Sequence, residues 1–360
     1  MITGKYLSFY QQALAFIPES RLIVDEFLTL TYSTDASFYR LVPKLIVIAD
    51  SEKEVVALMQ LACELELPIC FRAAGTSLSG QALSDSILIK LSEKWKELSV
   101  LEQGKQIRMG PMVLGSEANQ ALAPYNRMLA PMPASIDSAT VGGMAINNAA
   151  GMNSLDTYGM MASAKFVFLN GAKLDTACEF SRQAFRAQHP EIVEGIQTLS
   201  TRLKANKILS ERVRRKFQIK NTTGYGLRAL LDFDDAIDML AHLMIGSEGT
   251  LGFISEISHN TIPVHKYKAS AFLIFANIEI AGQAVMRFKQ AQTPVSAAEL
   301  IDYRSLQAVA DKPGVPSYLS SLPEQAVALL VQVESDSEQE LAHKVTLVSQ
   351  AISDRQLVRE

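Results

Sequence analysis

The feature that most constrains this chain is a loop of small residues between two short apolar runs. The loop spans residues 71–81 and reads Phe-Arg-Ala-Ala-Gly-Thr-Ser-Leu-Ser-Gly-Gln. The runs at 67–71 and 87–91 predict strands on either side of it. Small residues let the backbone approach a ligand closely, and consecutive loop amides can form a nest for an anion. The loop therefore predicts a site for an anion such as a pyrophosphate, with an ordinary surface turn as the alternative. It matches neither the P-loop pattern nor G-x-G-x-x-G.

Two further segments consist largely of small residues. Residues 131–154 carry almost no bulky or charged side chain, so they lack the stripe of large apolar residues that an ordinary amphipathic helix needs. Such a segment can pack its backbone against a flat, extended ligand, or it can form a tight core turn or a helix start. Residues 246–257 place three glycines just before a strand that begins near Ile254.

These segments, in this order, resemble the FAD-binding domain of the vanillyl-alcohol-oxidase superfamily. The most similar branch is that of the D-lactate dehydrogenases and glycolate oxidase D-subunits. Its first loop, R-G-A-G-T-S-L-S-G, matches residues 72–80 with Ala73 in place of one glycine, and its second motif matches residues 133–151. Its third motif, G-S-E-G-T-L-G, begins at Gly246, and K-N-x-x-G-Y-x-L occupies 220–227. The resemblance covers roughly residues 40–310.

The resemblance implies an α+β fold, with a two-subdomain PCMH-type FAD-binding domain followed by part of an α+β cap domain. We expect a helical extension at 1–36, the FAD-binding domain at 37–263 and the partial substrate domain at 264–360. FAD is expected to bind without a covalent bond, because neither 72–87 nor 131–154 contains His or Cys, although Cys70 lies just outside. The residues that the resemblance assigns to the cofactor are Arg72, Ala74, Gly75, Thr76, Ser77, Leu78, Ser79, Gly80, Pro133, Ser138, Thr140, Gly142, Gly143, Asn148, Gly151, Ser154, Glu248, Gly249 and Ile254.

The order of periodic segments is that of a mixed α/β chain. Residues 5–30 predict helix with a loop, and Ser51 with Glu54 predicts a capping box for a helix between two strands. Its apolar positions are Val55, Leu58, Met59 and Ala62. Further strands are expected at 45–49, 68–71, 165–169, 271–276 and 326–333, and helices at 181–217, 234–245, 280–291 and 338–353.

The activity that the resemblance implies is oxidation of a D-2-hydroxy acid, with D-lactate the first candidate. Glycolate and D-2-hydroxyglutarate are the alternatives, and a non-catalytic FAD-binding electron-relay subunit is a different class of function. The α-carbon hydride would pass to the flavin, the protein would supply a base and a cation, and electrons would leave to a quinone or another carrier. The sequence identifies no catalytic residue.

The sequence departs from this branch in one respect. The family's H-x-G-D-G-N-x-H metal motif is absent, and the five histidines are scattered without ligand spacing, so we expect no metal site. A truncated member is the expected explanation, and an iron–sulfur cluster would belong only to a C-terminal region beyond residue 360. Residues 1–360 are therefore expected to be incompetent alone; if they reduce flavin, Tyr225, Lys220 and His265 become the candidates.

Composition limits the partners and the compartment. A net charge of −4 gives no support to nucleic-acid binding, and no apolar run approaches the length of a membrane span. Three cysteines without metal spacing, and no signal peptide, predict a cytoplasmic protein. Peripheral association with the inner face of the cell membrane and oligomer formation stay open. The basic cluster at 212–216 is either a solvated helix face or a docking patch for an acidic partner or anionic lipid.

Overall fold

The computed structural model describes residues 2–153, 155–352 and 357–359. The chain forms two compact units: residues 1–151 with 155–262, and residues 152–154 with 263–360. Both units combine helices with sheets, so the α+β prediction is confirmed. None of the helices in the described ranges is both long enough and apolar enough to cross a bilayer.

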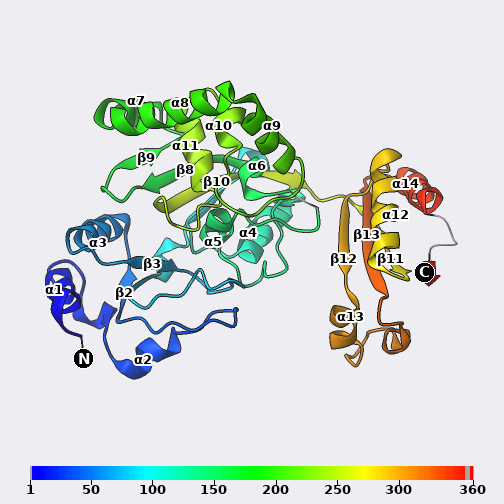
Figure 1. The fold of residues 1–360 in the computed structure, drawn as a ribbon, viewed down its shortest axis with the longest axis horizontal. Coiled ribbons are helices and arrows are strands. Elements are labelled where there is room, and N and C mark those ends of the chain that lie inside the picture. Colours follow the sequence, from blue (N-terminus) through cyan, green and yellow to red (C-terminus); the bar gives the residue numbers. More distant parts are fainter. Residues whose placement is uncertain (1, 154, 353–356, 360) are drawn as a thin grey trace. The chain divides into compact units, whose positions relative to one another are not determined.

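The first unit begins with a four-stranded sheet in the order β1-β2-β4-β3, of which β2 and β3 are labelled in Figure 1. β2, β3 and β4 are parallel, and β1 pairs antiparallel with β2. Four of the five residues of β2 and four of the five residues of β4 are buried, which is why both strands are apolar in the sequence apart from Lys90; β3 is only half-buried. The elements of this subdomain are α1 (Gly4–Ala13), η1 (Glu19–Arg21), β1 (Leu22–Ile23), α2 (Glu26–Thr31), β2 (Leu45–Ala49), α3 (Glu52–Glu64), β3 (Ile69–Arg72), β4 (Ile87–Leu91) and η2 (Glu93–Trp95).

The start of α3 differs from the prediction in one detail. The Ser51 hydroxyl accepts a hydrogen bond from the Glu54 amide at 3.3 Å, as a helix cap does. The Glu54 carboxylate instead accepts from the Asp50 amide at 2.7 Å and from the Arg21 guanidinium at 2.8 Å. The capping box is therefore half formed, because a bidentate arginine holds the carboxylate that would complete it. The predicted core positions of α3 are buried.

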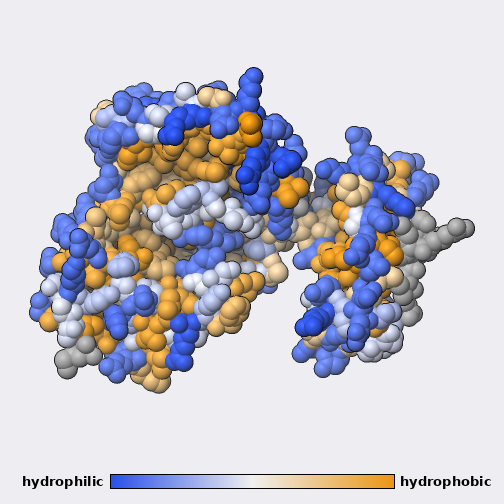
Figure 2. Space-filling view, viewed as in Figure 1, coloured by the Kyte–Doolittle hydropathy of each residue, from blue (hydrophilic) through white to orange (hydrophobic). Residues whose placement is uncertain are grey.

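The second subdomain is built on a sheet in the order β5-β6-β10-β8-β9, with β7 also paired to β10. Helices α7 to α11 belong to this subdomain, and the surface over α7 to α9 is mostly hydrophilic (Figure 2). Its strands are β5 (Leu98–Leu101), β6 (Gln106–Met109), β7 (Arg127–Leu129), β8 (Met161–Val167), β9 (Lys173–Asp175) and β10 (Phe253–Pro263). Its helices are η3 (Glu102–Gly104), α4 (Gly115–Leu122), η4 (Ala123–Tyr125), α5 (Val141–Asn147), α6 (Thr157–Met160), α7 (Glu179–Gln188), α8 (Pro190–Ala205), α9 (Lys207–Lys216), α10 (Ala229–Asp232) and α11 (Ala236–Met244).

Phe253 joins the two subdomains. It is the first residue of β10, and its ring lies 4.8 Å from that of Phe71 on β3 and 5.3 Å from that of Trp95. Aromatic pairs at these distances add to the burial of their area. The end of β3, where the first small-residue loop begins, is thereby fixed beside the start of β10, which lies within the third segment.

The second unit has a four-stranded antiparallel sheet in the order β12-β13-β11-β14. Leu273, Phe275 and Val331 pack with apolar residues of two helices, α12 and α14, and a separate cluster around Ile274 contains Leu306 of α13. The elements are β11 (Tyr267–Phe275), α12 (Ile278–Gln290), β12 (Ala297–Ile301), α13 (Tyr303–Val309), η5 (Ser317–Ser321), β13 (Val327–Ser335), α14 (Glu338–Ala351) and β14 (Leu357–Arg359).

Candidate functional site

The first small-residue segment forms a loop directly after β3. Gly75 and Gly80 have φ angles of +71° and +81°, which residues with a Cβ rarely adopt. The Ser77 hydroxyl accepts hydrogen bonds from the amides of Ser79 and Gln81, both at 3.2 Å, and donates to the Gln81 side chain. Within the described residues, the amides of 75–78 and of Gly80 have no acceptor. These free donors, in a loop with left-handed glycines, fit a phosphate-bearing ligand such as FAD.

The Arg72 side chain supports the loop through hydrogen bonds to other parts of the protein. Arg72 donates to the carbonyls of Tyr32 at 3.2 Å and Ala82 at 3.4 Å. A Cβ on Gly75 would lie 2.6 Å from the Arg72 guanidinium, so the two pack directly. Burial lowers the pKa of Arg72 from its ordinary value. Arg72 therefore shapes the loop as well as adding positive charge to it.

A second support comes from a segment that the sequence did not connect with the loop. The Ala36 amide donates to the Gly75 carbonyl at 3.0 Å. The Tyr39 ring lies against Gly80, where a Cβ would come within 3.1 Å of it. Residues 32–39 thus hold the loop, although residues up to 36 were predicted to be a separate extension. No local sequence pattern predicts these contacts, because about forty residues separate the two partners in each of them.

The second segment contains a short helix, α5, where the sequence predicted either ligand-facing backbone or a helix start. The Thr140 hydroxyl caps it by accepting from the Gly143 amide at 3.3 Å, and Asn148 ends it with φ of +56°. A Cβ on Gly142 would lie 2.9 Å from the Pro111 carbonyl, and one on Gly151 would lie 2.1 Å from the Met132 carbonyl. These two glycines are therefore required by packing within the chain, whatever ligand binds nearby.

The third segment connects the first two. The Gly246 amide donates to Ala145 of α5 at 3.1 Å, and the Glu248 amide donates to Ile146 at 2.9 Å. The Glu248 carboxylate accepts from the side-chain amide of Asn147 at 2.8 Å and, more weakly, from that of Gln81 at 3.5 Å. Burial raises the pKa of Glu248. A Cβ on Gly249 would meet no protein atom within 4 Å, so this glycine borders open space.

The fourth segment packs against the third. A Cβ on Gly224 would lie 1.9 Å from the Gly246 carbonyl, and the Tyr225 hydroxyl shares a hydrogen bond of 2.7 Å with that of Thr250. Lys220 donates to the Gly151 carbonyl at 3.3 Å. A small cavity lies here, lined by Asn148, Tyr158, Phe217, Asn221, Thr222, Thr223, Gly224, Gly226, Arg228, Ile245 and Gly246. The structure thus brings all four segments together in the first unit.

The sequence did not predict a partly buried polar network beside this cavity. Arg228 donates to Asp156 at 2.7 Å and stacks on the Tyr158 ring at 3.6 Å. Asp156 also accepts from the Asn148 side chain at 3.0 Å, and the Tyr158 hydroxyl donates to Asp232 at 2.8 Å. Burial, together with Asp232, raises the pKa of Tyr158. These residues fix the left-handed turn at Asn148.

The other predicted residues are more dispersed. Pro133 is half-buried, Ser138 is exposed, and Ile254 is buried in β10, paired with Phe166; Ser154 lies outside the described residues. His265 pairs with Asp336 in the second unit. In the described ranges, no three His, Cys, Asp or Glu side chains gather as metal ligands would.

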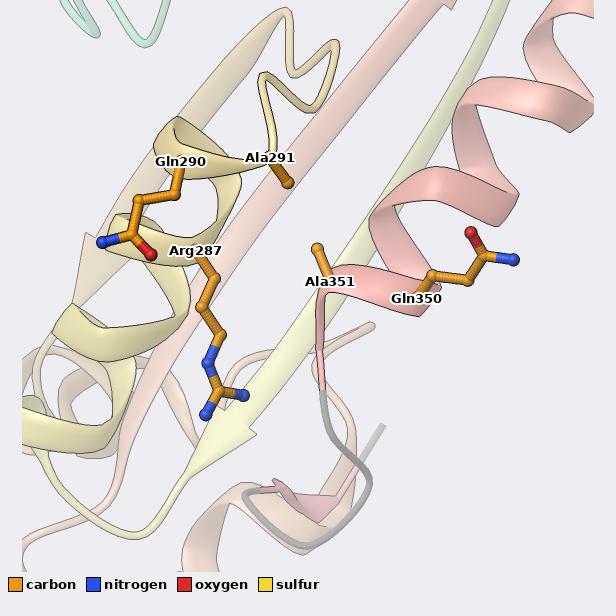
Figure 3. Close-up of a pocket in the computed structure, with 5 residues that line it drawn as sticks. All are labelled: Arg287, Gln290, Ala291, Gln350 and Ala351. Carbon is orange, nitrogen blue, oxygen red and sulfur yellow. The ribbon is translucent and has the colours of Figure 1, made fainter.

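Another pocket belongs to the second unit, which contains none of the cofactor segments described above apart from the start of the unit at residues 152–154. It has a volume of about 330 Å³ and is lined by Arg287, Gln290, Ala291, Gln350 and Ala351 (Figure 3). The two alanines face each other across the ends of α12 and α14, while Gln290 and Gln350 point away from each other. This lining includes no carboxylate, thiol or imidazole, so it offers no acid or base near neutral pH.

Two families match the chain, in the order that the resemblance implied. The "FAD binding domain" family matches residues 43–176, and the "FAD linked oxidases, C-terminal domain" family matches residues 264–359. Both matches support FAD as the cofactor.

Relatives of the chain are named as dehydrogenases or oxidases of 2-hydroxy acids. D-2-hydroxyglutarate dehydrogenase of Pantoea ananatis is 30% identical over 66% of this chain and 24% of its own length. Glycolate oxidase subunit GlcD of Escherichia coli K12 is 26% identical over 78% of this chain and 47% of its own. D-lactate dehydrogenase of Archaeoglobus fulgidus is 27% identical over 83% of this chain and 56% of its own length. The chain spans about a quarter to a half of these relatives.

Solved structures confirm the fold. Alkyldihydroxyacetonephosphate synthase aligns over 98% of this chain and 61% of its own, with a TM-score of 0.66 at 17% identity. The chain is therefore similar to the FAD-linked oxidases, with a match to their FAD-binding domain followed by a match to their C-terminal domain.

Proposed function

We propose that this chain is the flavin-carrying part of a dehydrogenase that oxidises a D-2-hydroxy acid. The observation that carries the proposal is that four separate segments contact one another in a chain, and that one of them is a loop whose amides at 75–78 and at Gly80 have no acceptor within the described residues. The names of the relatives support the chemistry, since they cover D-2-hydroxyglutarate, glycolate and D-lactate.

The residues divide into a cradle and its walls. The amides of 75–78 and Gly80 would bind the FAD pyrophosphate, over the Arg72 guanidinium. Residues of α5 and of the third segment would form the walls, held together by Glu248. FAD, when bound, supplies the acceptor for the α-carbon hydride. We propose residues 37–263 as the FAD-binding domain and 264–360 as part of the substrate domain.

D-lactate is the substrate that we propose first. Glycolate and D-2-hydroxyglutarate are the alternatives, since the relatives include enzymes named for each and identities near 27% do not separate them. A quinone or a carrier protein is the proposed electron acceptor.

The test is anaerobic mixing of the FAD-loaded complete gene product with each acid while the oxidised flavin band is followed. The complete product is used because the chain spans only part of its relatives. Bleaching by one of the three acids, and much less by L-lactate, is expected. FAD binding with no bleaching by any acid would overturn the dehydrogenase and leave the electron-relay function.

A further inference from the structure

Helix α9 carries an exposed stripe that none of the four segments uses. Ile208, Arg212 and Arg215 follow at i, i+4 and i+7, so they lie on one side of the helix. The opposite side is buried at Ser210 and Val213. Ile208 is 85% exposed, and Ile219, in the turn that follows the helix, is 67% exposed. We call these four residues, Ile208, Arg212, Arg215 and Ile219, the α9 ridge.

The surroundings of the α9 ridge are strongly basic. Residues 202–220 include a single acidic side chain, Glu211, in a chain whose net charge is −4. Lys204 pairs with Asp234, but in the part of the chain that the structure describes no carboxylate pairs with Arg212 or Arg215. Figure 2 shows hydrophilic side chains interrupted by apolar ones over this helix. The basic residues of this stretch are Arg202, Lys204, Lys207, Arg212, Arg214, Arg215, Lys216 and Lys220.

We propose that the α9 ridge docks the protein on an anionic lipid bilayer. Basic side chains attract the negative charge of such a surface, and exposed isoleucines between them can enter its acyl boundary. A nucleic acid would use the positive charges but give the isoleucines no apolar surface to contact. A folded acidic partner would need a groove shaped to this convex helix, whereas a fluid bilayer needs none.

The α9 ridge is close in the chain to the segments that would bind the flavin. The chain runs from α9 directly into the fourth segment, and Phe217 between them lines the cavity beside Asn148. Docking would therefore hold the flavin segments close to the lipid surface. The docking itself depends only on the α9 ridge and stands independently of the proposed oxidation.

Vesicle flotation of the FAD-loaded chain tests the proposal. We expect it to float with vesicles containing phosphatidylglycerol, to stay behind with phosphatidylcholine alone, and to be released by high salt. Arg212→Glu with Arg215→Glu should lower the partition coefficient roughly 30-fold or more, since each basic residue contributes roughly fivefold. Ile208→Ser with Ile219→Ser should lower it roughly tenfold, because two apolar side chains no longer enter the boundary.

The matched control is Lys53→Glu with Lys289→Glu. Both lysines are exposed on other helices, and the double change alters the net charge by the same amount as the arginine pair. This control should float like the unchanged chain. The proposal is wrong if the unchanged chain does not float, if either ridge variant floats equally well, or if the control loses binding as the arginine variant does. Binding to a single-stranded oligonucleotide without flotation would assign the basic surface to nucleic acid instead.

Discussion

The side-chain amide of Asn147 donates a hydrogen bond of 2.8 Å to the carboxylate of Glu248. The same carboxylate lies 3.5 Å from the side-chain nitrogen of Gln81, so one acidic group links α5 with the loop after β3. Glu248 itself has a φ angle of +53°, a left-handed conformation that residues other than glycine adopt only rarely. One side chain therefore links three of the four segments, in addition to the backbone hydrogen bonds that join the third segment to α5.

Replacing Glu248 by alanine should weaken FAD binding roughly tenfold, because the hydrogen bonds that position α5 and the loop would be lost. Glu248→Gln keeps an acceptor oxygen toward Asn147 and should bind FAD within a few-fold of the unchanged chain. Titration calorimetry with FAD measures both affinities, and Glu211→Ala, an exposed change on α9, serves as the control. Equal affinity for Glu248→Ala and the control would remove the linking role.

The loop glycines should be intolerant of a side chain. Gly75→Ala and Gly80→Ala each force a Cβ residue to a left-handed φ, at about 1–2 kcal/mol, and press on Arg72 or Tyr39. Displacing the loop amides should leave the purified protein with little flavin. Gly195→Ala is the matched control, because Gly195 has open space around its Cβ position and no positive φ. Full flavin content in both loop variants would show that the loop does not hold the cofactor.

The elements and segments with local signals could be predicted from the sequence. The continuous apolar runs gave β2 and β4, and the helical spacing gave the buried face of α3. Three of the segments stand out in the sequence because they are rich in small residues, and the fourth is identified only by the family resemblance. Their assembly was not visible, since Gln81 and Glu248 are separated by 167 positions.

The misses share that cause. Arg21 draws the Glu54 carboxylate away from its cap across 33 positions, and Arg228 pairs with Asp156 across 72. Tyr39 supports Gly80 although it precedes the strand that leads to the loop. A local sequence pattern shows which residues are able to form a contact, but the partner that each side chain contacts depends on the tertiary structure.

FAD should be released by acid, since Cys70 is the one cysteine beside the first loop and it is poorly suited to covalent attachment. Burial raises the pKa of the Cys70 thiol to about 11, so the reactive thiolate is scarce at neutral pH. After acid precipitation the yellow colour should remain in the supernatant, and Cys70→Ala should keep its flavin. Thiol titration of the native protein should detect Cys63 and Cys178, which are exposed, before Cys70. Colour retained in the pellet of the unchanged chain, but not of Cys70→Ala, would establish a covalent bond.

His259 occupies an unusual place on β10, opposite Ile107 of β6 and Met161 of β8. It is fully buried, and neither ring nitrogen has a hydrogen-bond partner within the described residues. Burial lowers the pKa of His259 from 6.5 to about 4, because a charged imidazole has no compensation there. Between about pH 4 and about pH 6.5 the unfolded chain therefore binds a proton on this imidazole, while the folded chain does not. As a result, His259 does not lower the free energy of unfolding above about pH 6.5, but it lowers that free energy progressively as the pH drops toward 4.

Replacing His259 by leucine should remove this acid sensitivity. Between about pH 8 and about pH 5, His259 lowers the free energy of unfolding by about 2 kcal/mol. Over the same pH range, the free energy of unfolding of the leucine variant should fall by about 2 kcal/mol less than that of the unchanged chain. It should also be more stable at neutral pH, because two unpaired polar atoms leave the core. Urea unfolding followed by the fluorescence of Trp95, the single tryptophan of the sequence, reports on the unit that contains His259. His343→Gln, at an exposed position of α14, should leave the pH dependence unchanged. If His259→Leu destabilises as steeply with acid as the unchanged chain, other groups must bind the proton.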